Sequence, residues 1–424
     1  MFQLRFVDFV IIFFGALQVY FSARSFLGGI SYLRYFQRFK VNKSALGAGH
    51  LPFATVFVPC RGNEPFLVEN LESLLRQNYP RYEIIFAVDD IRDPARAVIQ
   101  HLVSVHDNRK DCMARLIEVR PENRAGRKVE LLRAATLVAD RASEVFVFAD
   151  SDVQPRADWL AALVAPLGNE DVGATTGYRW FLPKAWSLAG QIRAAWNASI
   201  ASALGENRGK NFCWGGSTAI RRSIFEELQI RDRWLGTASD DFILTRELKK
   251  ANLGIVFVPA ALSVSKGDCS FAELLEFTTR QMKITRVYFP NLWLASLLGS
   301  GLFVFVTAAA VIVFGVKTVS GDAALQLILG TILLIVALLS IGKIVLRAGA
   351  IALALPERAG SVRIQAAMHC LLWPLTTYIF FYNALAAAAS RRIVWRGIEY
   401  ELISDWQLEV IENNDDLSRS DRGK

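Results

Sequence analysis

The sequence predicts an α/β domain with a mostly parallel, Rossmann-like sheet, inserted between an N-terminal transmembrane helix and a C-terminal helical membrane block. One observation is that short apolar runs alternate with stretches of helical periodicity between residues 51 and 283. This alternation is typical of a parallel sheet with right-handed helical crossovers. The other is that one long apolar stretch precedes this region and three follow it, each near the roughly 20 residues that span a bilayer.

These patterns divide the chain into four parts. We expect an N-terminal transmembrane helix with a basic flank, an α/β domain that ends in an interfacial helix, a membrane block of about three spans, and a polar tail. The corresponding residues are 1–43, 44–286, 287–395 and 396–424.

The N-terminal helix is expected from Phe6 to about residue 23, where nearly every residue is apolar. A signal peptide is the alternative, but no small-residue cleavage site followed by a polar chain is present. The basic residues that follow the stretch are Arg34, Arg38, Lys40 and Lys43. By the positive-inside rule, they indicate that the next domain is cytoplasmic.

The α/β domain is expected to contain strands and helices in alternation. Apolar runs of strand length lie at 54–59, 82–88, 115–119, 145–149 and 253–259. Helical periodicity lies at 67–77, 95–105 and 130–140. After the last strand, Phe271–Arg286 mixes apolar and basic residues, a pattern typical of an amphipathic helix in the membrane interface.

Three apolar blocks follow, at 292–316, 323–341 and about 364–389. Buried helices are the alternative, but three in succession without a strand–turn rhythm favour membrane spans. Four full spans that start outside would leave the tail outside, whereas Arg391, Arg392 and Arg396 suggest that it is inside. Two short passes within 323–356, or a re-entrant segment, would resolve this conflict. The end of the chain, from Asn413, is polar and expected to be disordered.

Composition excludes several classes of protein. Hydrophobic residues make up 53% of the chain and charged residues 21%, which is unusual for a soluble protein. The net charge of +8 is dispersed and flanks membrane segments, so it indicates attraction to anionic lipid and no nucleic-acid partner. The 5 cysteines form no CxxC pair and the 4 histidines lack ligand spacing, which argues against zinc and a disulfide framework.

Polar groups follow three of the predicted strands where each strand ends. They are the segment Pro59–Glu64, the pair Asp89–Asp90, and Asp150-Ser151-Asp152. Ligands of open α/β sheets collect at that edge, and two aspartates spaced by one residue project to one face. Carboxylate oxygens suit Mg²⁺ or Mn²⁺, completed by phosphates of a substrate. The alternative is that these residues only cap helices or turns.

Two further segments add to this edge. A glycine flanked by cations in Arg124–Lys128, just ahead of a helix, favours contact with phosphate, although a solvated basic turn would look the same. In Cys213–Ser217, Gly215 and Gly216 would let the backbone approach a sugar and Trp214 offers an apolar platform. The alternative for that segment is an ordinary turn.

Taken together, these motifs resemble one family. The chain is similar to the GT-A glycosyltransferases of family 2, and within them to the ceramide glucosyltransferase group, family 21. The matching segments are Pro59–Glu64, Asn70–Leu74, Gln77–Glu83, Val88–Ala95, Gly126–Lys128, Ala149–Asp152 and Ser239–Phe242. The family's three aspartates followed by (Q/R)xxRW correspond to Asp90, Asp150, Asp241 and Arg280–Ile284. The last element departs from the pattern, because Lys283 replaces Arg and Ile284 replaces Trp.

The resemblance implies a role for each matched residue. Arg61, Glu64 and Asp90 would line the nucleoside pocket, and Lys128 and Asp150 would also contact the donor. Asp150 and Asp152 would bind the cation, and Asp241 would be the general base. The acceptor side would comprise Trp214, Gly215, Gly216, Asp240, Arg280, Lys283 and Arg286.

The resemblance therefore implies an inverting transfer of one sugar from a UDP-sugar, such as UDP-glucose, to a membrane lipid, with ceramide favoured. Diacylglycerol or a hopanoid are alternative acceptors. A processive polysaccharide synthase is the nearest rival, but such enzymes normally carry an intact QxxRW and more helices. An inactive membrane-anchored binding protein is opposed by the complete set of acidic motifs. A transporter is disfavoured because the predicted spans hold few ionisable residues, mainly Lys343 and His369.

Overall fold

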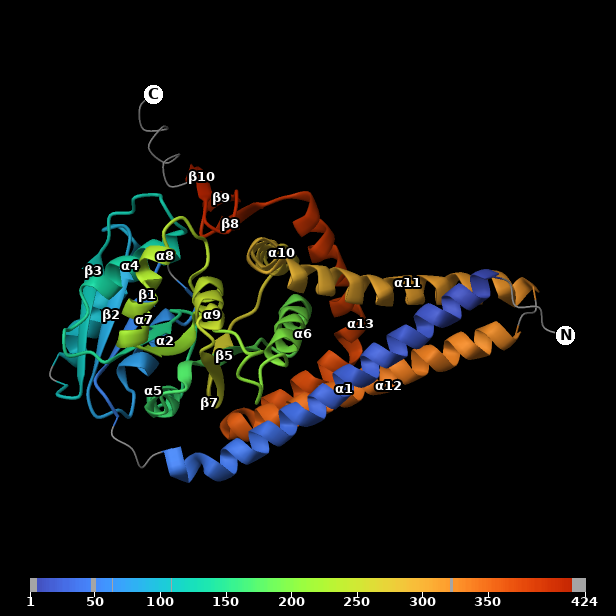
Figure 1. Cartoon of the computed structure of the whole chain (residues 1–424), viewed down its shortest axis with the longest axis horizontal. Coiled ribbons are helices and arrows are strands. Elements are labelled where there is room, and N and C mark those ends of the chain that lie inside the picture. The colour runs from blue at the N-terminus through green and yellow to red at the C-terminus, as the bar shows by residue number, and fades with distance from the viewer. Residues whose placement is uncertain (1–5, 47–50, 63, 108, 321–322, 414–424) are drawn as a thin grey trace. The chain divides into compact units, whose positions relative to one another are not determined.

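The computed structural model of the chain describes residues 6–46, 51–62, 64–107, 109–320 and 323–413. The chain divides into two compact units, each assembled from three separate segments (Figure 1). The sheet unit comprises Arg38–Lys184, Ala203–Cys269 and Ser390–Lys424. The helical unit comprises Met1–Gln37, Ala185–Ser202 and Ser270–Ala389.

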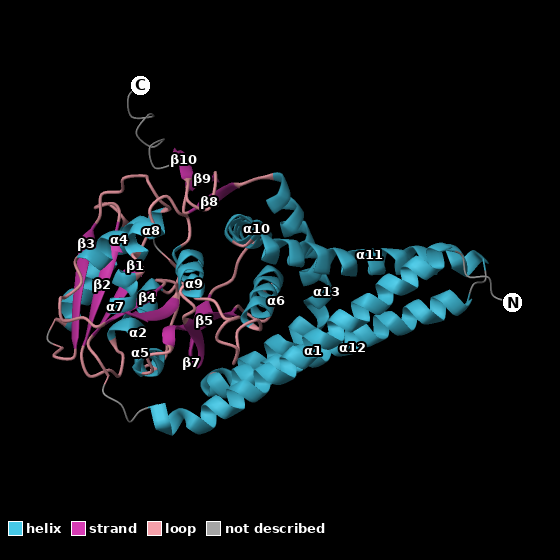
Figure 2. Cartoon of the chain, in the orientation of Figure 1, coloured by secondary structure: helices cyan, strands magenta, loops and turns pink. Residues whose placement is uncertain are grey.

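The sheet unit contains a seven-stranded sheet with the order β3-β2-β1-β4-β6-β5-β7 (magenta in Figure 2). The strands are β1 (Ala54–Pro59), β2 (Tyr82–Val88), β3 (Cys112–Glu118), β4 (Val145–Ala149), β5 (Val172–Leu182), β6 (Ser217–Arg221) and β7 (Gly254–Lys266). All neighbouring strands are parallel except β6, which pairs antiparallel with β4 and β5. The mostly parallel sheet is confirmed, while β5 and β6 are additional to the strands expected from the sequence.

Helices connect these strands. They are α2 (Leu67–Leu75), α3 (Pro94–His106), α4 (Arg127–Leu137), α5 (Trp159–Val164), α7 (Arg222–Glu227), α8 (Ile230–Arg233) and α9 (Asp240–Lys250), with a 3-10 turn at Ala165–Gly168. The first three correspond to the helices expected from periodicity. The start of α3 shows how local sequence sets a boundary: Pro94 occupies the first turn, and the Asp93 side chain accepts a hydrogen bond from the Ala95 amide.

The central strands are covered on both faces, which is why β1, β2 and β4 are continuous apolar runs with every residue buried. One face packs against α2, α3 and α5. On the opposite face, the ring of Phe57 contacts those of Phe146 and Phe148, which in turn contact the rings of Phe225 and Trp234. Successive strand residues point to opposite faces, so these two layers bury the side chains of both faces. The polar residues that directly follow the strands therefore lie at the carboxyl edge of the sheet.

A second, three-stranded antiparallel sheet lies in the sheet unit near the end of the chain. It consists of β8 (Arg392–Trp395), β9 (Ile398–Leu402) and β10 (Leu408–Asn413). None of these strands was expected from the sequence, which predicts a membrane block up to residue 395 and a polar tail from 396. The signal was present in Ile398–Leu402, where apolar and polar residues alternate and burial alternates with them. The tail from 414 to 424 lies outside the described residues.

The helical unit contains the long apolar helices. They are α1 (Phe6–Leu46, which continues into the sheet unit), α11 (Pro290–Ser320), α12 (Ala323–Ala354) and α13 (Ala359–Ala389). The unit also contains the shorter helices α6 (Leu188–Ala201) and α10 (Phe271–Tyr288) and a 3-10 turn at Pro356–Arg358. Among the described residues, four helical segments are long and apolar enough to cross a membrane: Phe6–Phe39, Pro290–Gly315, Ala323–Ala354 and Pro356–Ala389. Since α12 is one continuous helix, the alternative of two short passes within 323–356 is wrong.

Contacts within the helical unit explain how these helices pack. α1 lies beside α12 (Figure 1), where a Cβ added at Gly15 would come within 2.6 Å of the Ile332 side chain. α10 packs on α13, and its Thr279 hydroxyl donates a hydrogen bond of 2.9 Å to the Asn383 side chain. Between apolar helices in a membrane, hydrophobic burial does not favour one partner over another. Close packing at small residues and hydrogen bonds between helices then determine which helices associate.

Candidate active site

The carboxylates of Asp150 and Asp152, which follow the end of β4, converge on one side chain of β5. Nη2 of Arg179 donates to Asp150 Oδ2 at 2.7 Å and to Asp152 Oδ1 at 2.9 Å. Nη1 of the same guanidinium donates to Asp152 Oδ2 at 2.9 Å. Asp-x-Asp spacing at a strand end therefore directs both carboxylates to a common point, as the sequence predicts. Arg179 was absent from the predicted site, because nothing in its local sequence marks it.

Lys128, in the first turn of α4, joins this cluster to the second acidic pair. Its Nζ lies 2.8 Å from Asp150 Oδ1 and 3.2 Å from Asp240 Oδ1. Burial opposes the charge on Lys128, but Asp150, Asp240 and Asp241 together raise its pKa. Burial alone would likewise raise the pKa of Asp150, whereas Lys128 and Arg179 lower it overall. Both groups are thus held in their charged forms.

Asp240 and Asp241 begin α9, but their surroundings differ. Asp241 is partly exposed, and its carboxylate accepts hydrogen bonds from the Gly215 amide at 3.2 Å, the Phe242 amide at 2.8 Å and the Ser239 hydroxyl. Asp240 is only 5% exposed. Burial raises the pKa of Asp240 to about 6, with Lys128 opposing and Asp241 and Asp150 adding to the rise. The two neighbouring aspartates therefore lie in different surroundings, and Asp241 is the more accessible of the two.

The turn at Gly215 and Gly216 passes between both acidic pairs. A Cβ at Gly215 would lie 2.2 Å from Asp240 Oδ2 and 2.8 Å from Lys128 Nζ. A Cβ at Gly216 would lie 2.6 Å from Asp150 Oδ2 and 2.3 Å from the ring of Trp214. Real Cβ atoms do not approach so closely, so a larger residue at either position would displace the neighbouring side chains, the carboxylates among them.

Trp214 contacts the cation that holds the first acidic pair. The guanidinium of Arg179 lies 5.1 Å from the centre of the Trp214 ring, within cation–π range. The ring of Tyr178 lies 5.5 Å away on another side. The indole therefore helps to orient Arg179, whereas contact of this segment with a sugar stays a prediction.

The predicted nucleoside pocket lies at the ends of β1 and β2. Arg61 forms an ion pair with Asp89, and Arg127 Nε lies 3.0 Å from Asp89 Oδ2. Asp90 is more exposed and pairs with its neighbour Arg92 at 2.7 Å. Burial raises the pKa of Asp89, although the two arginines oppose that rise. The resemblance assigned a role in the nucleoside pocket to Asp90 and none to Asp89. The sequence does not show which of two adjacent aspartates is buried, because their burial depends on the folded sheet.

Arg280, Lys283 and Arg286, which were predicted on the acceptor side, lie on α10 in the helical unit. Within that unit Arg280 is 3.5 Å from Glu276, and Arg286 donates to the carbonyls of Ala387 and Ala388. A cation at the last carbonyls of α13 stabilises that helix end. These contacts of Arg280 and Arg286 are structural, and an acceptor role for Arg280, Lys283 and Arg286 stays a prediction.

The predicted metal ligands fit a divalent cation. Among the described residues there is no group of three or more His, Cys, Asp or Glu side chains placed to hold a metal. However, Mg²⁺ is commonly held by one or two carboxylates and the phosphates of a substrate. Asp150 and Asp152 already direct one oxygen each to a single cationic nitrogen of Arg179. This convergence is the arrangement that two carboxylate ligands of one ion require.

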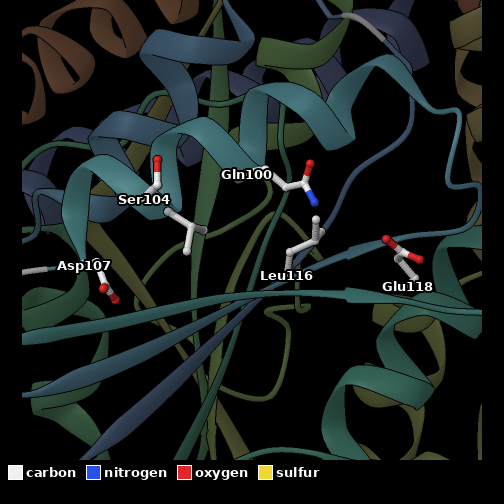
Figure 3. Close-up of a pocket in the computed structure, with 6 residues that line it drawn as sticks. Gln100, Ser104, Asp107, Leu116 and Glu118 are labelled. Atoms are coloured by element: carbon white, nitrogen blue, oxygen red, sulfur yellow. The ribbon is translucent and has the colours of Figure 1, made fainter.

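A separate pocket of about 640 Å³ lies between α3 and β3 (Figure 3). Gln100 and Ser104 of α3 line it together with Leu116 and Glu118 of β3. None of the predicted site residues lines this pocket, and β3 is at the edge of the sheet. The acidic cluster is therefore the candidate active site.

A model of glycosyl transferase family 21 matches residues 23–407. The chain belongs to glycosyltransferase family 21. The match spans the sheet unit, including the C-terminal strands up to β9, and most of the helical unit. The family 21 protein is accordingly a glycosyltransferase of the GT-A fold with apolar membrane helices, as the sequence predicts.

This family 21 chain is also similar to several solved structures. The mannosyltransferase PcManGT from Pyrobaculum calidifontis, solved with GDP-Man and Mn²⁺, is 18% identical, with a TM-score of 0.45 over 89% of this chain and 98% of that one. GalNAc-T7, solved with UDP, GalNAc and Mn²⁺, is 15% identical, with a TM-score of 0.40 over 56% of this chain and 48% of that one. Glucosyl-3-phosphoglycerate synthase from Mycobacterium tuberculosis is 16% identical, with a TM-score of 0.35 over 57% of this chain and 81% of that one.

Proposed function

We propose that this family 21 enzyme transfers one sugar from a UDP-sugar, in the first instance UDP-glucose, to the hydroxyl group of a membrane lipid, with ceramide as the favoured acceptor. The observation that carries the proposal is the turn at Gly215 and Gly216. The Gly215 amide of this turn donates a hydrogen bond to Asp241, and a Cβ at the next residue, Gly216, would lie 2.6 Å from Asp150 Oδ2. A base and a diphosphate-binding pair are thereby available to one substrate.

The donor end uses residues that recognise a nucleoside diphosphate. Arg61, Glu64 and Asp90 would contact the nucleoside, and Lys128 would contact the diphosphate. Mg²⁺ or Mn²⁺ held by Asp150 and Asp152 would offset the negative charge that develops on the leaving UDP. The charged forms in which Lys128 and Asp150 are held suit both roles.

Asp241 would act as the general base. Its carboxylate takes the proton from the acceptor hydroxyl as that oxygen forms a bond to the anomeric carbon. The bond from this carbon to the diphosphate oxygen breaks, and UDP leaves with the electron pair. A single displacement from the opposite face inverts the anomeric centre, so an α-linked donor gives a β-glycoside.

A lipid acceptor follows from the apolar helices and from the amphipathic sequence of α10. Each buried CH₂ of an acyl chain adds about 0.8 kcal/mol to membrane binding. A lipid hydroxyl therefore reaches a much higher concentration at the membrane surface than a soluble sugar with the same headgroup. The basic residues after the first apolar stretch favour a cytoplasmic position for the catalytic unit.

The test uses the purified full chain in lipid nanodiscs. UDP-glucose, UDP-galactose and GDP-mannose are each combined with ceramide, diacylglycerol and a hopanoid, and products are identified by mass spectrometry and by β-specific glycosidase digestion. The Asp241→Asn variant is the inactive control. The proposal expects one β-linked sugar on ceramide with a UDP-sugar. A ladder of oligosaccharides would instead support a processive synthase, and a preference for diacylglycerol or the hopanoid would overturn the choice of acceptor.

A further inference from the structure

Within the sheet unit, the C-terminal sheet packs against the start of α4, close to the predicted nucleoside pocket. The phenolic oxygen of Tyr400 in β9 accepts a hydrogen bond of 3.3 Å from the amide of Arg127, the first residue of α4. Tyr400 is only 2% exposed. The sheet therefore covers the start of the helix that also carries Lys128 into the active site.

The same sheet also contacts α9, whose first turn carries Asp240 and Asp241. Asp405 lies 2.6 Å from Arg246, and the guanidinium of Arg246 is 3.9 Å from the centre of the Trp406 ring. The carbonyl of Trp406 approaches Gly236 so closely that a Cβ there would lie 2.1 Å away. These contacts fix the sheet at a second point, so the turn between β8 and β9 is held in place.

That turn consists of Arg396 and Gly397, with φ values of 52° and 78°. Two-residue hairpin turns with positive φ at both positions strongly favour Asn, Asp or Gly at the first. An arginine in the left-handed region is uncommon and costs conformational free energy. Its presence at this position points to a use for the guanidinium that offsets this cost.

The guanidinium of Arg396 forms an ion pair with Glu64, in the segment after β1. The side chains of Arg396 and Glu64 are 32% and 16% exposed, so the pair is partly accessible to a ligand. Burial, assisted by the nearby charge of Arg61, lowers the pKa of Arg396. Arg396 is thus added to the residues that were predicted to line the nucleoside pocket, although it is more than 300 positions away in the sequence.

The neighbourhood is suited to a ligand that is both anionic and able to donate a hydrogen bond. Three arginines meet there, Arg61, Arg127 and Arg396, and Asp89 pairs with the first two. Oδ1 of Asp89 is buried and has no hydrogen-bond partner among the described residues. Buried acceptors are rarely left unsatisfied, so a donor group of a ligand would complete the site.

We infer that Arg396 is a donor-binding residue, which contacts the nucleoside monophosphate half of the nucleotide from the C-terminal sheet. A guanidinium can stack on a base or donate two parallel hydrogen bonds to a phosphate. On donor binding it exchanges part of its pairing with Glu64 for the nucleotide. This inference rests on the proposed function only in taking a nucleotide-linked sugar as the donor.

The experiment measures nucleotide binding to the full chain by calorimetry, without turnover. Wild type is first titrated with UDP, GDP and ADP. Arg396→Gln is then expected to lower the affinity for the nucleotide that binds wild type about 10- to 100-fold, the loss typical of one hydrogen bond to a charged group. The affinity for UMP should fall by a similar factor, because UMP retains the half of the nucleotide that Arg396 contacts. Arg392→Gln is the matched control, since Arg392 lies in β8 of the same sheet and is 3.6 Å from the exposed Glu401.

The same substitution in a Glu64→Gln background distinguishes contact with the nucleotide from a purely structural role of Arg396 as the partner of Glu64. If Arg396 contacts the nucleotide, Arg396→Gln still weakens binding when Glu64 is already neutral. Wild-type affinity in Arg396→Gln, or no further loss in the double variant, would overturn the inference. If Arg396→Gln loses its thermal transition, Arg396→Lys replaces it. Weaker binding is still expected there because an ammonium cannot reproduce the guanidinium fork, and wild-type affinity would again overturn the inference.

The wild-type titration separates this inference from the proposed function. Binding of GDP or ADP in place of UDP would overturn the proposed donor, while the Arg396 variants would be tested with whichever nucleotide binds. Binding of none of the three would overturn both.

Discussion

Arg179 holds Asp152 through two hydrogen bonds of 2.9 Å each, from Nη1 to Oδ2 and from Nη2 to Oδ1. The second nitrogen also bonds Asp150. The guanidinium is therefore bound at the point where a divalent cation would meet the same carboxylates. A metal bound as predicted would compete with Arg179 for these oxygens, and the diphosphate of a donor would relieve the competition by offering oxygens to both.

The first prediction concerns this competition. Arg179→Gln should bind Mn²⁺ in the absence of nucleotide about 10-fold or more tightly than wild type, because a hydrogen-bonded charged competitor worth on the order of 1.5–3 kcal/mol is removed. Electron paramagnetic resonance of free Mn²⁺ measures the affinity. Arg156→Gln, which removes a pair with Asp158 outside the cluster, is the control and should match wild type. Equal Mn²⁺ affinity in wild type and Arg179→Gln would mean that the guanidinium does not exclude the ion.

The second prediction concerns the loss of a predicted metal ligand, which should weaken metal binding. Asp152→Asn is expected to abolish turnover and weaken UDP binding, because the diphosphate loses its bridge to the protein. EDTA should reproduce this loss in wild type, and Mg²⁺ or Mn²⁺ should restore the rate. The exposed Asp171→Asn serves as a matched control. Full activity of the wild type in EDTA would rule out the metal assignment.

Asp241→Asn should retain its fold and its affinity for UDP-sugar while losing most of the rate. General-base catalysis contributes typically about 10²–10⁴-fold, so a loss in or above that range is expected in initial-rate assays. A rate within a few-fold of wild type would show that another residue takes the proton. Asp240 would be examined first, because it is adjacent and buried beside Lys128.

Asp240 also predicts how stability depends on pH. Burial raises the pKa of Asp240 from its ordinary value of 3.8 to about 6 in the folded protein, so the folded protein binds this proton more tightly. The stability it contributes is therefore complete below the unfolded pKa and is lost as pH rises through about 6. Asp240→Asn lacks this dependence, so its melting temperature relative to wild type should be higher at pH 8 than at pH 5. A constant difference in melting temperature across that range would contradict the raised pKa.

Gly215→Ala tests the close packing of the site. Its Cβ would be placed 2.2 Å from Asp240 Oδ2, so the carboxylate and Lys128 must shift. Overpacking of this kind costs about 1–3 kcal/mol, and the displaced charges should lower the rate as well. Thermal unfolding and initial rates are measured beside Gly205→Ala, where a Cβ meets nothing within 4 Å. If both alanine variants retain wild-type rates, the turn does not position the acidic pairs.

Several features were predictable because their cause is local. Val145–Ala149 is continuously apolar since that strand is buried on both faces, and Asp150 and Asp152 follow it in a spacing that determines their common direction. The apolar helices were likewise evident from length and composition. The C-terminal strands were missed because they are short and half exposed, and their burial depends on distant surfaces such as Gly236 and the start of α4.

The sequence by itself determined the alternation of strands and helices, the apolar helices, and which aspartates follow strand ends, since each depends on residues close in the chain. Only the tertiary structure decided that Arg179 bridges Asp150 and Asp152, that Asp89 and not Asp90 is buried between arginines, and that Arg396 reaches Glu64. These pairings join residues tens to hundreds of positions apart. The order of the strands and the packing of the second sheet determine which charged residues meet. The charge of a residue alone does not specify which oppositely charged residue the fold places beside it.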